Sequence, residues 1–160
     1  MQGLILNKEQ EFYSLFSTLF DKIKEFALDY NWLISNAECY PQKIKYNEKL
    51  NQRYCWLSGM ELASILVDED FQWVWGVLSG FNKVILADEV LKYPLPYTDG
   101  YEGFWKNPIN LQHPLAEVEI VAFDSKCTLF ISKKNIIIQK IASFYPQLID
   151  LEKYNIYNCQ

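Results

Sequence analysis

The sequence is poor in the residues on which catalysis usually depends. It contains one histidine, His113, which lies in a loop-like run just before Pro114. The chain has no GxSxG or HExxH pattern, and no glycine-rich phosphate loop followed by Lys and Ser or Thr. A dyad of His113 with a cysteine would need contacts that no motif supports, so an exposed or loop-packed imidazole is expected. The sequence therefore indicates no catalytic residue.

Positive charge is also scarce, and its distribution narrows the choice of partner. Arg53 is the one arginine, and the formal net charge is −5. Between Asp68 and Glu119 there are nine acidic residues against three lysines, a balance of −6. Because nucleic-acid binding rests on Lys and Arg contacts that release counterions, this chain is not expected to bind nucleic acid. A basic protein partner would instead be attracted.

Long apolar runs and cysteine motifs are absent as well. The longest apolar stretches, such as 136–138, are far shorter than the roughly 20 residues that span a bilayer. The N-terminal residues resemble no secretory signal, so no membrane association is expected and a cytoplasmic location is predicted. The four cysteines form no CxxC pair and have no histidine at ligand spacing. This pattern favours reduced, structural thiols, and no metal or cofactor is expected.

What the chain does contain is a large apolar content. Half of its residues are hydrophobic and 16% are aromatic, a composition that excludes disorder. At 160 residues it is expected to form one domain, residues 1–160. A domain of this size buries about two-thirds of its unfolded surface, so a well-filled core is predicted.

The stretch 71–79 predicts the central strand of a sheet. It is rich in aromatic and β-branched residues and ends in a Ser-Gly turn. Trp73 and Trp75 are expected to share one face of this strand, with Val74 and Leu78 on the other. A strand that is apolar on both faces belongs inside a sheet that is covered on both faces.

Helical periodicity and capping residues predict three helices. A long N-terminal helix is expected at 8–29, a short middle helix at 59–67 and a C-terminal helix at 133–144. The side chains expected to cap them are Asn7 with Gln10, Ser58 with Glu61, and Ser132.

Further strands complete the predicted fold. Strands are expected at 31–39 and 54–57, a hairpin at 117–123 and 127–131, and a short strand at 83–87. The segment 42–52 is expected to be a loop, 88–92 a helical turn, and 147–156 an edge strand or a surface segment. Together these elements predict an α+β fold with a mostly antiparallel sheet of about five strands.

The segment 93–108 is a predicted loop of unusual composition. It holds three prolines and two glycines, together with three tyrosines, a phenylalanine and a tryptophan. Loops of this length inside a compact domain are uncommon and often functional. Two interpretations remain open: a surface loop pinned to the sheet by its aromatic side chains, or a recognition surface rich in Tyr and Trp.

Adjacent carboxylates occur at 68–70, at 88–89 and at Glu117 with Glu119. The triplet at 68–70 lacks the spaced oxygen ligands and the glycine of a calcium loop. Glu117 and Glu119 lie at alternate positions of a strand and are expected to mark its solvated side. A solvated surface is favoured over chemistry for all three groups.

Three runs, 31–36, 71–81 and 117–127, resemble a family of small bacterial proteins of unknown function. In size, acidity and aromatic content the chain is also similar to immunity proteins of contact-dependent growth inhibition and other polymorphic toxin systems. This resemblance implies a cytosolic protein that binds one cognate toxin domain, often a basic nuclease, and blocks it. None of the three runs is a functional motif, so the resemblance transfers no site residue.

The leading hypothesis is therefore a non-enzymatic immunity protein that binds a basic toxin domain through an acidic, aromatic-rich surface. The candidate contact residues are Asp68, Glu69, Asp70, Asp88, Glu89, Tyr97, Asp99, Tyr101, Glu102 and Trp105. One alternative is an enzyme or small-ligand-binding protein with an aromatic pocket near Trp73, Trp75, Cys127 and Tyr97. The other is a subunit of a stable oligomer.

Overall fold

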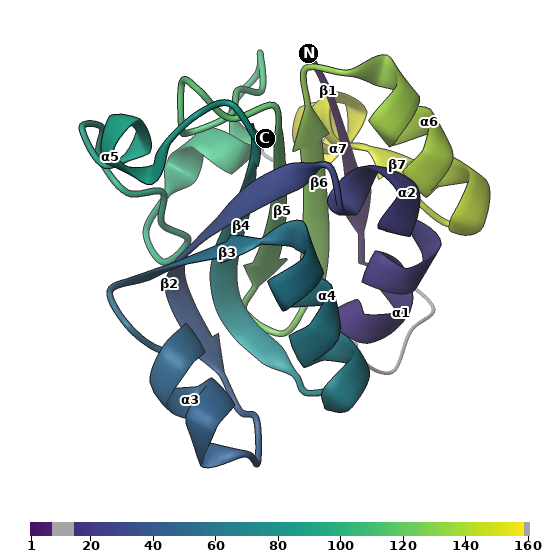
Figure 1. The fold of residues 1–160 in the computed structure, drawn as a ribbon. Helices are drawn as coiled ribbons and strands as arrows, with labels where there is room; N and C mark the ends of the chain where they lie inside the picture. The colour runs from purple at the N-terminus through teal and green to yellow at the C-terminus, as the bar shows by residue number, and fades with distance from the viewer. Residues whose placement is uncertain (8–14, 159–160) are drawn as a thin grey trace.

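The computed structural model describes residues 1–7 and 15–158, and its centre is one seven-stranded sheet (Figure 1). The strand order is β3-β2-β4-β5-β6-β1-β7, and all neighbouring strands are antiparallel. The strands are β1 Gln2–Leu6, β2 Tyr30–Cys39, β3 Tyr54–Ser58, β4 Trp73–Asn82, β5 Val118–Phe123, β6 Cys127–Ser132 and β7 Ile149–Asp150. The predicted α+β class and antiparallel sheet are confirmed, but the sheet has seven strands where about five were predicted.

The helices are short and distributed along the chain. They are α1 Phe16–Lys22, α2 Lys24–Ala27, α3 Ile44–Leu50, α4 Gly59–Asp68, α5 Ala87–Val90, the 3₁₀ helix η1 Glu102–Trp105, α6 Asn135–Phe144 and α7 Leu151–Asn158. None that the structure describes is long and apolar enough to cross a membrane.

The single long helix predicted at 8–29 is wrong for the part that the structure describes. Leu15 is extended and forms an isolated β-bridge with Gln72, so α1 begins only after it. Ile23 leaves helical geometry and separates α1 from α2. The start predicted at Asn7 and Gln10 falls on 8–14, outside the described residues.

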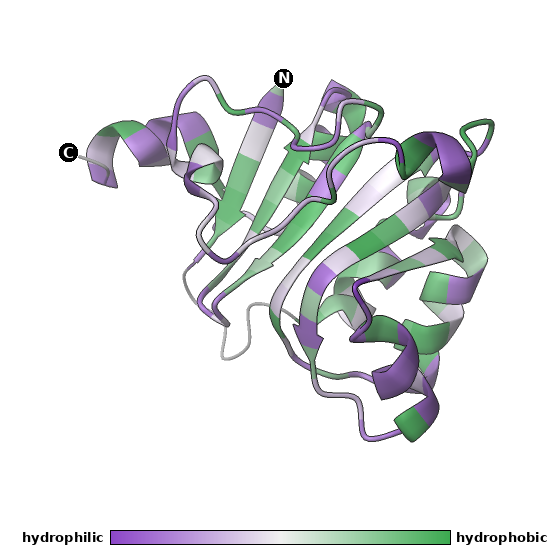
Figure 2. Cartoon of the chain, turned by 90° about the vertical axis from the view of Figure 1, so that its left-hand side faces the viewer, coloured by the Kyte–Doolittle hydropathy of each residue, from purple (hydrophilic) through white to green (hydrophobic). Residues whose placement is uncertain are grey.

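Both faces of the sheet are covered, as the apolar central strand predicted. Helices α1, α2, α4 and α6 pack on one face, around Trp32, Trp73 and Phe130. The segment 91–117, which we call the covering loop, packs on the other face together with α7, and it buries Phe104 there. Figure 2 looks onto the covering loop, which crosses in front of the strands. The sheet therefore separates a helix-covered side from a loop-covered side.

The central strand predicted at 71–79 is β4, which lies between β2 and β5. Trp73 and Trp75 pair with consecutive residues of β2, so Val74 is an extra residue of β4 and forms a bulge. Trp73 consequently packs in the helix-covered core, whereas Trp75 packs on the ring of Phe123 on the loop-covered side, 4.9 Å between ring centroids. The prediction that the two tryptophans share a face is wrong, because a bulge interrupts the alternation of side chains.

Three local predictions are confirmed. The Ser58 hydroxyl accepts a hydrogen bond from the Glu61 amide (3.2 Å), and the Glu61 carboxylate accepts one from the Ser58 amide (2.8 Å), which starts α4. The predicted hairpin is formed by β5 and β6, and Asp124 and Ser125 at its turn have φ of 52° and 51°. The helical turn predicted at 88–92 is present as α5.

The two ends of the described chain differ from prediction. The N-terminal residues, for which no element was predicted, form β1 between β6 and β7. Ile5 of β1 packs on the loop-covered side and Leu6 on the helix-covered side, as a strand in a doubly covered sheet requires. The segment 147–156 supplies the short edge strand β7, which was one of two alternatives, and then continues as α7.

Three internal predictions also need correction. The loop predicted at 42–52 contains α3. The strand predicted at 83–87 is a turn, because the Ile85 amide donates to the carbonyl oxygen of Asn82 (2.9 Å). The Ser132 hydroxyl accepts the Lys134 amide (3.0 Å), but Lys134 itself holds the N-cap position, so α6 begins at Asn135.

Candidate functional site

Side chains of β2 hold the first part of the covering loop. Asn36 lies in a β-bulge of β2 and has a φ of 50°. Its Oδ1 accepts hydrogen bonds from the amide and from the hydroxyl of Thr98, both at 2.7 Å. The hydroxyl of buried Ser35 donates to the Pro96 carbonyl, also at 2.7 Å. The bulge thus directs an amide side chain out of the sheet and fixes the loop's backbone.

Glu119 of β5 holds the second part of the covering loop. Its side chain is 0% exposed, and its Oε1 and Oε2 accept the backbone amides of His113 and Gln112, both at 3.0 Å. The Ser79 hydroxyl of β4 also donates to this carboxylate (3.4 Å). The expectation that Glu119 marks a solvated side is wrong, because the covering loop lies over that face of β5.

The environment of Glu119 acts on its pKa in opposing directions. Burial disfavours the charged form and raises the pKa to about 7, whereas the Gln112 and His113 amides favour the carboxylate. Gln112 in turn bonds both backbone groups of Tyr97, donating to its carbonyl (2.8 Å) and accepting from its amide (3.0 Å). One buried carboxyl therefore connects the sheet to both halves of the loop.

His113 is packed inside the loop, which is one of its two predicted environments. Its Nδ1 accepts the Leu115 amide (3.2 Å), so Nε2 carries the proton and donates to the Val90 carbonyl (3.1 Å). The ring lies edge-on to Phe81 and Tyr93. Burial lowers the pKa of His113, so this fully buried imidazole is neutral and structural.

Several aromatic side chains of the covering loop pin it to the sheet. Phe104 is buried, with Tyr101 packed on its ring at 4.7 Å between centroids. Trp105 packs on Phe123 of β5 at 5.0 Å. Tyr97 differs, because 47% of its surface is exposed. The pinning interpretation thus describes most of the loop's aromatic residues, and Tyr97 is left to face solvent.

The acidic triplet lies elsewhere, at the end of α4, where it holds the segment that contains α3. Asp68 forms an ion pair with Lys43 (2.7 Å), whose hydrogen bond helps to lower the Asp68 pKa to about 2. Glu69 accepts the backbone amides of residues 42–43. Asp70 is exposed. Because α4 packs on the helix-covered side, the triplet is not brought together with the covering loop.

The other candidate carboxylates lie on α5 and on the covering loop. Glu89 accepts the Leu86 amide (3.0 Å) and so caps α5, and Glu102 pairs with Lys106 at 2.5 Å. Asp88 and Asp99 are exposed and form no ion pair with any residue that the structure describes. Of the nine carboxylates in the acidic central third, three form ion pairs and Glu119 is buried, so Asp88 and Asp99 are two of the remaining five.

Exposed apolar side chains recur along α5 and the adjoining part of the covering loop, a region that we call the 86–99 surface. Leu86 is 65% exposed, and the other exposed members are Leu91, Tyr93 and Tyr97. Arg53 and Tyr54, at the start of the edge strand β3, line a cleft with Leu91 and Tyr93. The 86–99 surface combines aromatic and aliphatic side chains with the carboxylates of Asp88 and Asp99.

A second group of titratable side chains joins β2 to the residues just before β5 and α6. The Tyr30 hydroxyl donates to Glu117 (2.7 Å), and Lys134 forms an ion pair with the same carboxylate oxygen (2.6 Å). Burial raises the pKa of Tyr30 to about 12, and the Glu117 hydrogen bond raises the pKa of Lys134. Both groups keep their protons at neutral pH and donate to the Glu117 carboxylate, so the cluster clamps β2 to the segments before β5 and α6.

The thiols and carboxylates of the described chain do not form a metal-binding group. Within residues 1–7 and 15–158 no three His, Cys, Asp or Glu side chains lie close enough to hold one ion together. Cys39, Cys55 and Cys127 are buried free thiols, and burial raises the pKa of Cys39 and Cys127 to about 12. Trp73 and Trp75 point to opposite faces of the sheet, so the two cannot line one aromatic pocket.

Sequence reasoning missed the residues that hold the covering loop in place. These are Ser35, Asn36, Gln112 and Glu119. A usable signal was present: a single carboxylate between apolar residues of a strand, close in sequence to a long aromatic loop, indicates a buried anchor. Comparisons with protein-family models, with curated proteins and with solved structures found no match for this chain.

Proposed function

We propose that this chain is a non-enzymatic binding protein that recognises a cognate protein domain through the 86–99 surface. The observation that carries the proposal is that side chains of the sheet hold the backbone of an irregular loop by hydrogen bonds. Buried Glu119 and Ser35 and the bulged Asn36 hold its backbone, while Tyr97 stays exposed. A loop whose order is built in before binding loses less conformational entropy when it binds, which is the advantage of a preorganised recognition surface.

The composition of the 86–99 surface supports a protein as the ligand. Tyr side chains provide large contact area with few rotatable bonds, and they are frequent among the residues that dominate binding energy. Leu86, Leu91, Tyr93 and Tyr97 are all exposed, and Leu91 and Tyr93 line one cleft; exposed tyrosine and leucine side chains are typical of an interface centre. Asp88 and Asp99 lie at this surface without ion-pair partners among the described residues, which favours a basic partner.

The partner class is taken from the resemblance to immunity proteins. A basic toxin domain, such as a nuclease, would present the cations that Asp88 and Asp99 complement. In this proposal the triplet 68–70 has a structural role, because Asp68 and Glu69 already bond the segment of α3. Tyr101 and Trp105 support the loop from beneath, and the contact role falls to Tyr93 and Tyr97.

The proposal is tested by measuring binding to a basic toxin domain, for which the first candidate is one encoded by the gene next to that of this chain. Tyr97→Ala is expected to weaken binding by about 30-fold or more, as for a residue at the centre of an interface. Asp99→Asn should slow association and reduce its dependence on salt. Tyr157→Ala and Asp70→Asn make the same chemical changes at exposed positions outside the surface and should leave binding unchanged.

Two results would count against the proposal. Equal loss of binding in the surface variants and in their controls would remove the 86–99 surface from the interface. Turnover of a substrate by the purified chain, lost on substitution of Tyr30 or His113, would favour an enzyme.

A further inference from the structure

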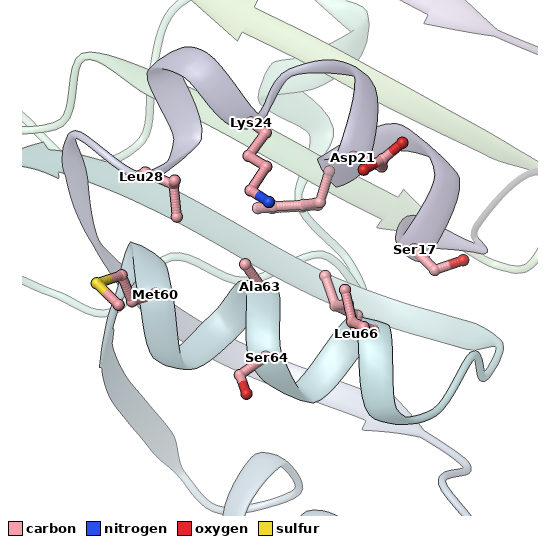
Figure 3. Close-up of a pocket in the computed structure, with 10 residues that line it drawn as sticks. Ser17, Asp21, Lys24, Leu28, Met60, Ala63, Ser64 and Leu66 are labelled. Carbon is pink, nitrogen blue, oxygen red and sulfur yellow. The ribbon is translucent and has the colours of Figure 1, made fainter.

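A groove of about 300 Å³ lies between α4 and the pair α1 and α2, on the helix-covered side (Figure 3). Its lining consists of Ser17, Phe20, Asp21, Lys24, Leu28, Met60, Ala63, Ser64, Leu66 and Val67. The 86–99 surface shares no residue with the groove, and the covering loop lies on the other face of the sheet. The groove is therefore separate from the proposed protein-binding surface.

Helix α4 carries two apolar stripes where a surface helix needs one. Leu62 and Ile65 are buried in the core beneath the helix. Met60, Ala63 and Val67 follow the spacing i, i+3, i+7, which places them on one further side of the helix. Met60 is 72% exposed and Val67 is 83% exposed. An ordinary amphipathic helix carries polar side chains at such positions, so this second stripe forms an unfilled apolar wall.

The opposite wall adds one directed positive charge. Phe20 and Leu28 supply apolar surface, and Lys24 lies between them along the chain. Figure 3 shows the Lys24 ammonium group in the space between the helices, whereas the polar ends of Asp21 and Ser64 point away from it. Lys24 forms no ion pair with any residue in the described part of the chain. The groove thus offers an apolar wall and one unpaired cation.

We propose that this groove binds a small monocarboxylate with an unbranched apolar chain. The carboxylate pairs with Lys24, and the chain lies against Met60, Ala63 and Val67. Apolar lining with a single polar directing group is the usual composition of small-ligand sites, and the groove volume falls at the lower end of their range. The stripe from Met60 to Val67 spans about 10 Å at 1.5 Å per residue, which limits the length of chain that it can cover.

This proposal predicts that affinity depends separately on the length of the apolar chain and on the carboxylate. Each CH₂ group that enters the groove should raise affinity by about fourfold, until the chain outgrows the stripe. The ion pair is solvent-exposed, so the carboxylate should add only a further few-fold over a neutral head group of the same chain length. A ligand that is too short or is uncharged should therefore bind measurably but more weakly.

The chain provides its own spectroscopic control, because Met1 and Met60 are its two methionines. In protein labelled with ¹³C at the methionine methyl groups, octanoate is expected to shift the Met60 signal and to leave the Met1 signal in place. Titration with hexanoate, octanoate and decanoate measures the dependence on chain length. Titration with 1-octanol isolates the contribution of the carboxylate.

Variants locate the site. Lys24→Met should reduce affinity for octanoate to about that for 1-octanol, whereas Lys83→Met, which removes an exposed lysine that does not line the groove, should have no effect. Ala63→Trp should fill the groove and abolish the Met60 shift. Far-UV circular dichroism of each variant establishes that it is folded, and the unmodified chain alone already tests the proposal through its two methionine signals.

Several outcomes would overturn the proposal. These are a Met60 signal unaffected by octanoate, equal shifts of both methionines, or affinities independent of chain length. Dimers in sedimentation that dissociate on Ala63→Trp would identify the groove as an interface between copies of this chain. Binding to anionic phospholipid vesicles without binding of octanoate would identify it as a membrane-contact surface.

Discussion

The buried carboxyl of Glu119 makes a sharp prediction about pH. The pKa of Glu119 is raised from 4.5 to about 7 by burial, so the folded state binds a proton there more tightly than the unfolded state. Its contribution to stability is fully present below about pH 4.5 and is lost as the pH rises through 7. This difference in pKa between the folded and unfolded states should lower the free energy of unfolding by roughly 2–3 kcal/mol between about pH 5 and pH 8.

Glu119→Gln removes this titration while keeping the shape of the side chain. The variant loses part of the hydrogen bonding to the Gln112 and His113 amides at every pH, which we expect to cost about 1–3 kcal/mol. Titration of Glu119 lowers the stability of the wild type towards alkaline pH, and the variant lacks that titration. The deficit of the variant in free energy of unfolding should therefore shrink by roughly 2–3 kcal/mol between about pH 5 and pH 8.

Urea denaturation followed by tryptophan fluorescence measures both proteins across this range. The quantity to compare is the difference in free energy of unfolding between the two proteins. The titration of His113 has the opposite sign but occurs in both, so it cancels in that difference. Its pKa is lowered by burial, so its contribution is present above 6.5 and is lost as the pH falls. Glu48→Gln makes the same chemical change on the exposed surface of α3 and should run parallel to wild type. Parallel curves for wild type and Glu119→Gln would refute the reasoning.

Three further predictions concern stability and are measured by chemical denaturation. Asn36→Gly and Asn36→Ala both lose the bonds to Thr98, but only glycine adopts the left-handed backbone without strain. The alanine variant should therefore be less stable than the glycine variant by about 1–2 kcal/mol. Equal stability of the two variants would contradict backbone strain at this position. Ser58→Ala should cost about 1 kcal/mol, because it removes the hydroxyl that caps α4; an unchanged midpoint would contradict this. Phe104→Ala should cost about 3–5 kcal/mol, whereas Tyr97→Ala should stay within about 0.5 kcal/mol; similar losses would mean that Tyr97 also pins the loop.

The structure alters the meaning of the acidic central third. Of its nine carboxylates, Glu119 is buried, and Asp68, Glu102 and Glu117 form ion pairs. The charge that remains for a partner is therefore smaller than the sequence balance of −6 suggests. Electrostatic attraction in the proposed complex then acts mainly on the rate of encounter, and the exposed tyrosines provide most of the affinity.

Local signals along the chain determined a large part of this fold. The capping box at Ser58 and Glu61, the hairpin of β5 and β6 and the central position of β4 all follow from neighbouring residues, because caps, turns and strand patterns are short-range effects. A long loop rich in aromatic residues was also evident from composition. The sequence alone thus established the class of the fold and the segment that carries the proposed surface.

Tertiary structure decided the rest, since it depends on which distant segments meet. β1 is a strand because β6 and β7 pair with it, and Leu15 leaves the helix because Gln72 pairs with it. Glu119 is buried because the covering loop crosses its face of β5, a contact that alternation along one strand cannot reveal. The Val74 bulge likewise separates two tryptophans that simple alternation places together. Periodicity describes how side chains alternate along a segment, whereas burial depends on what the folded chain lays over it.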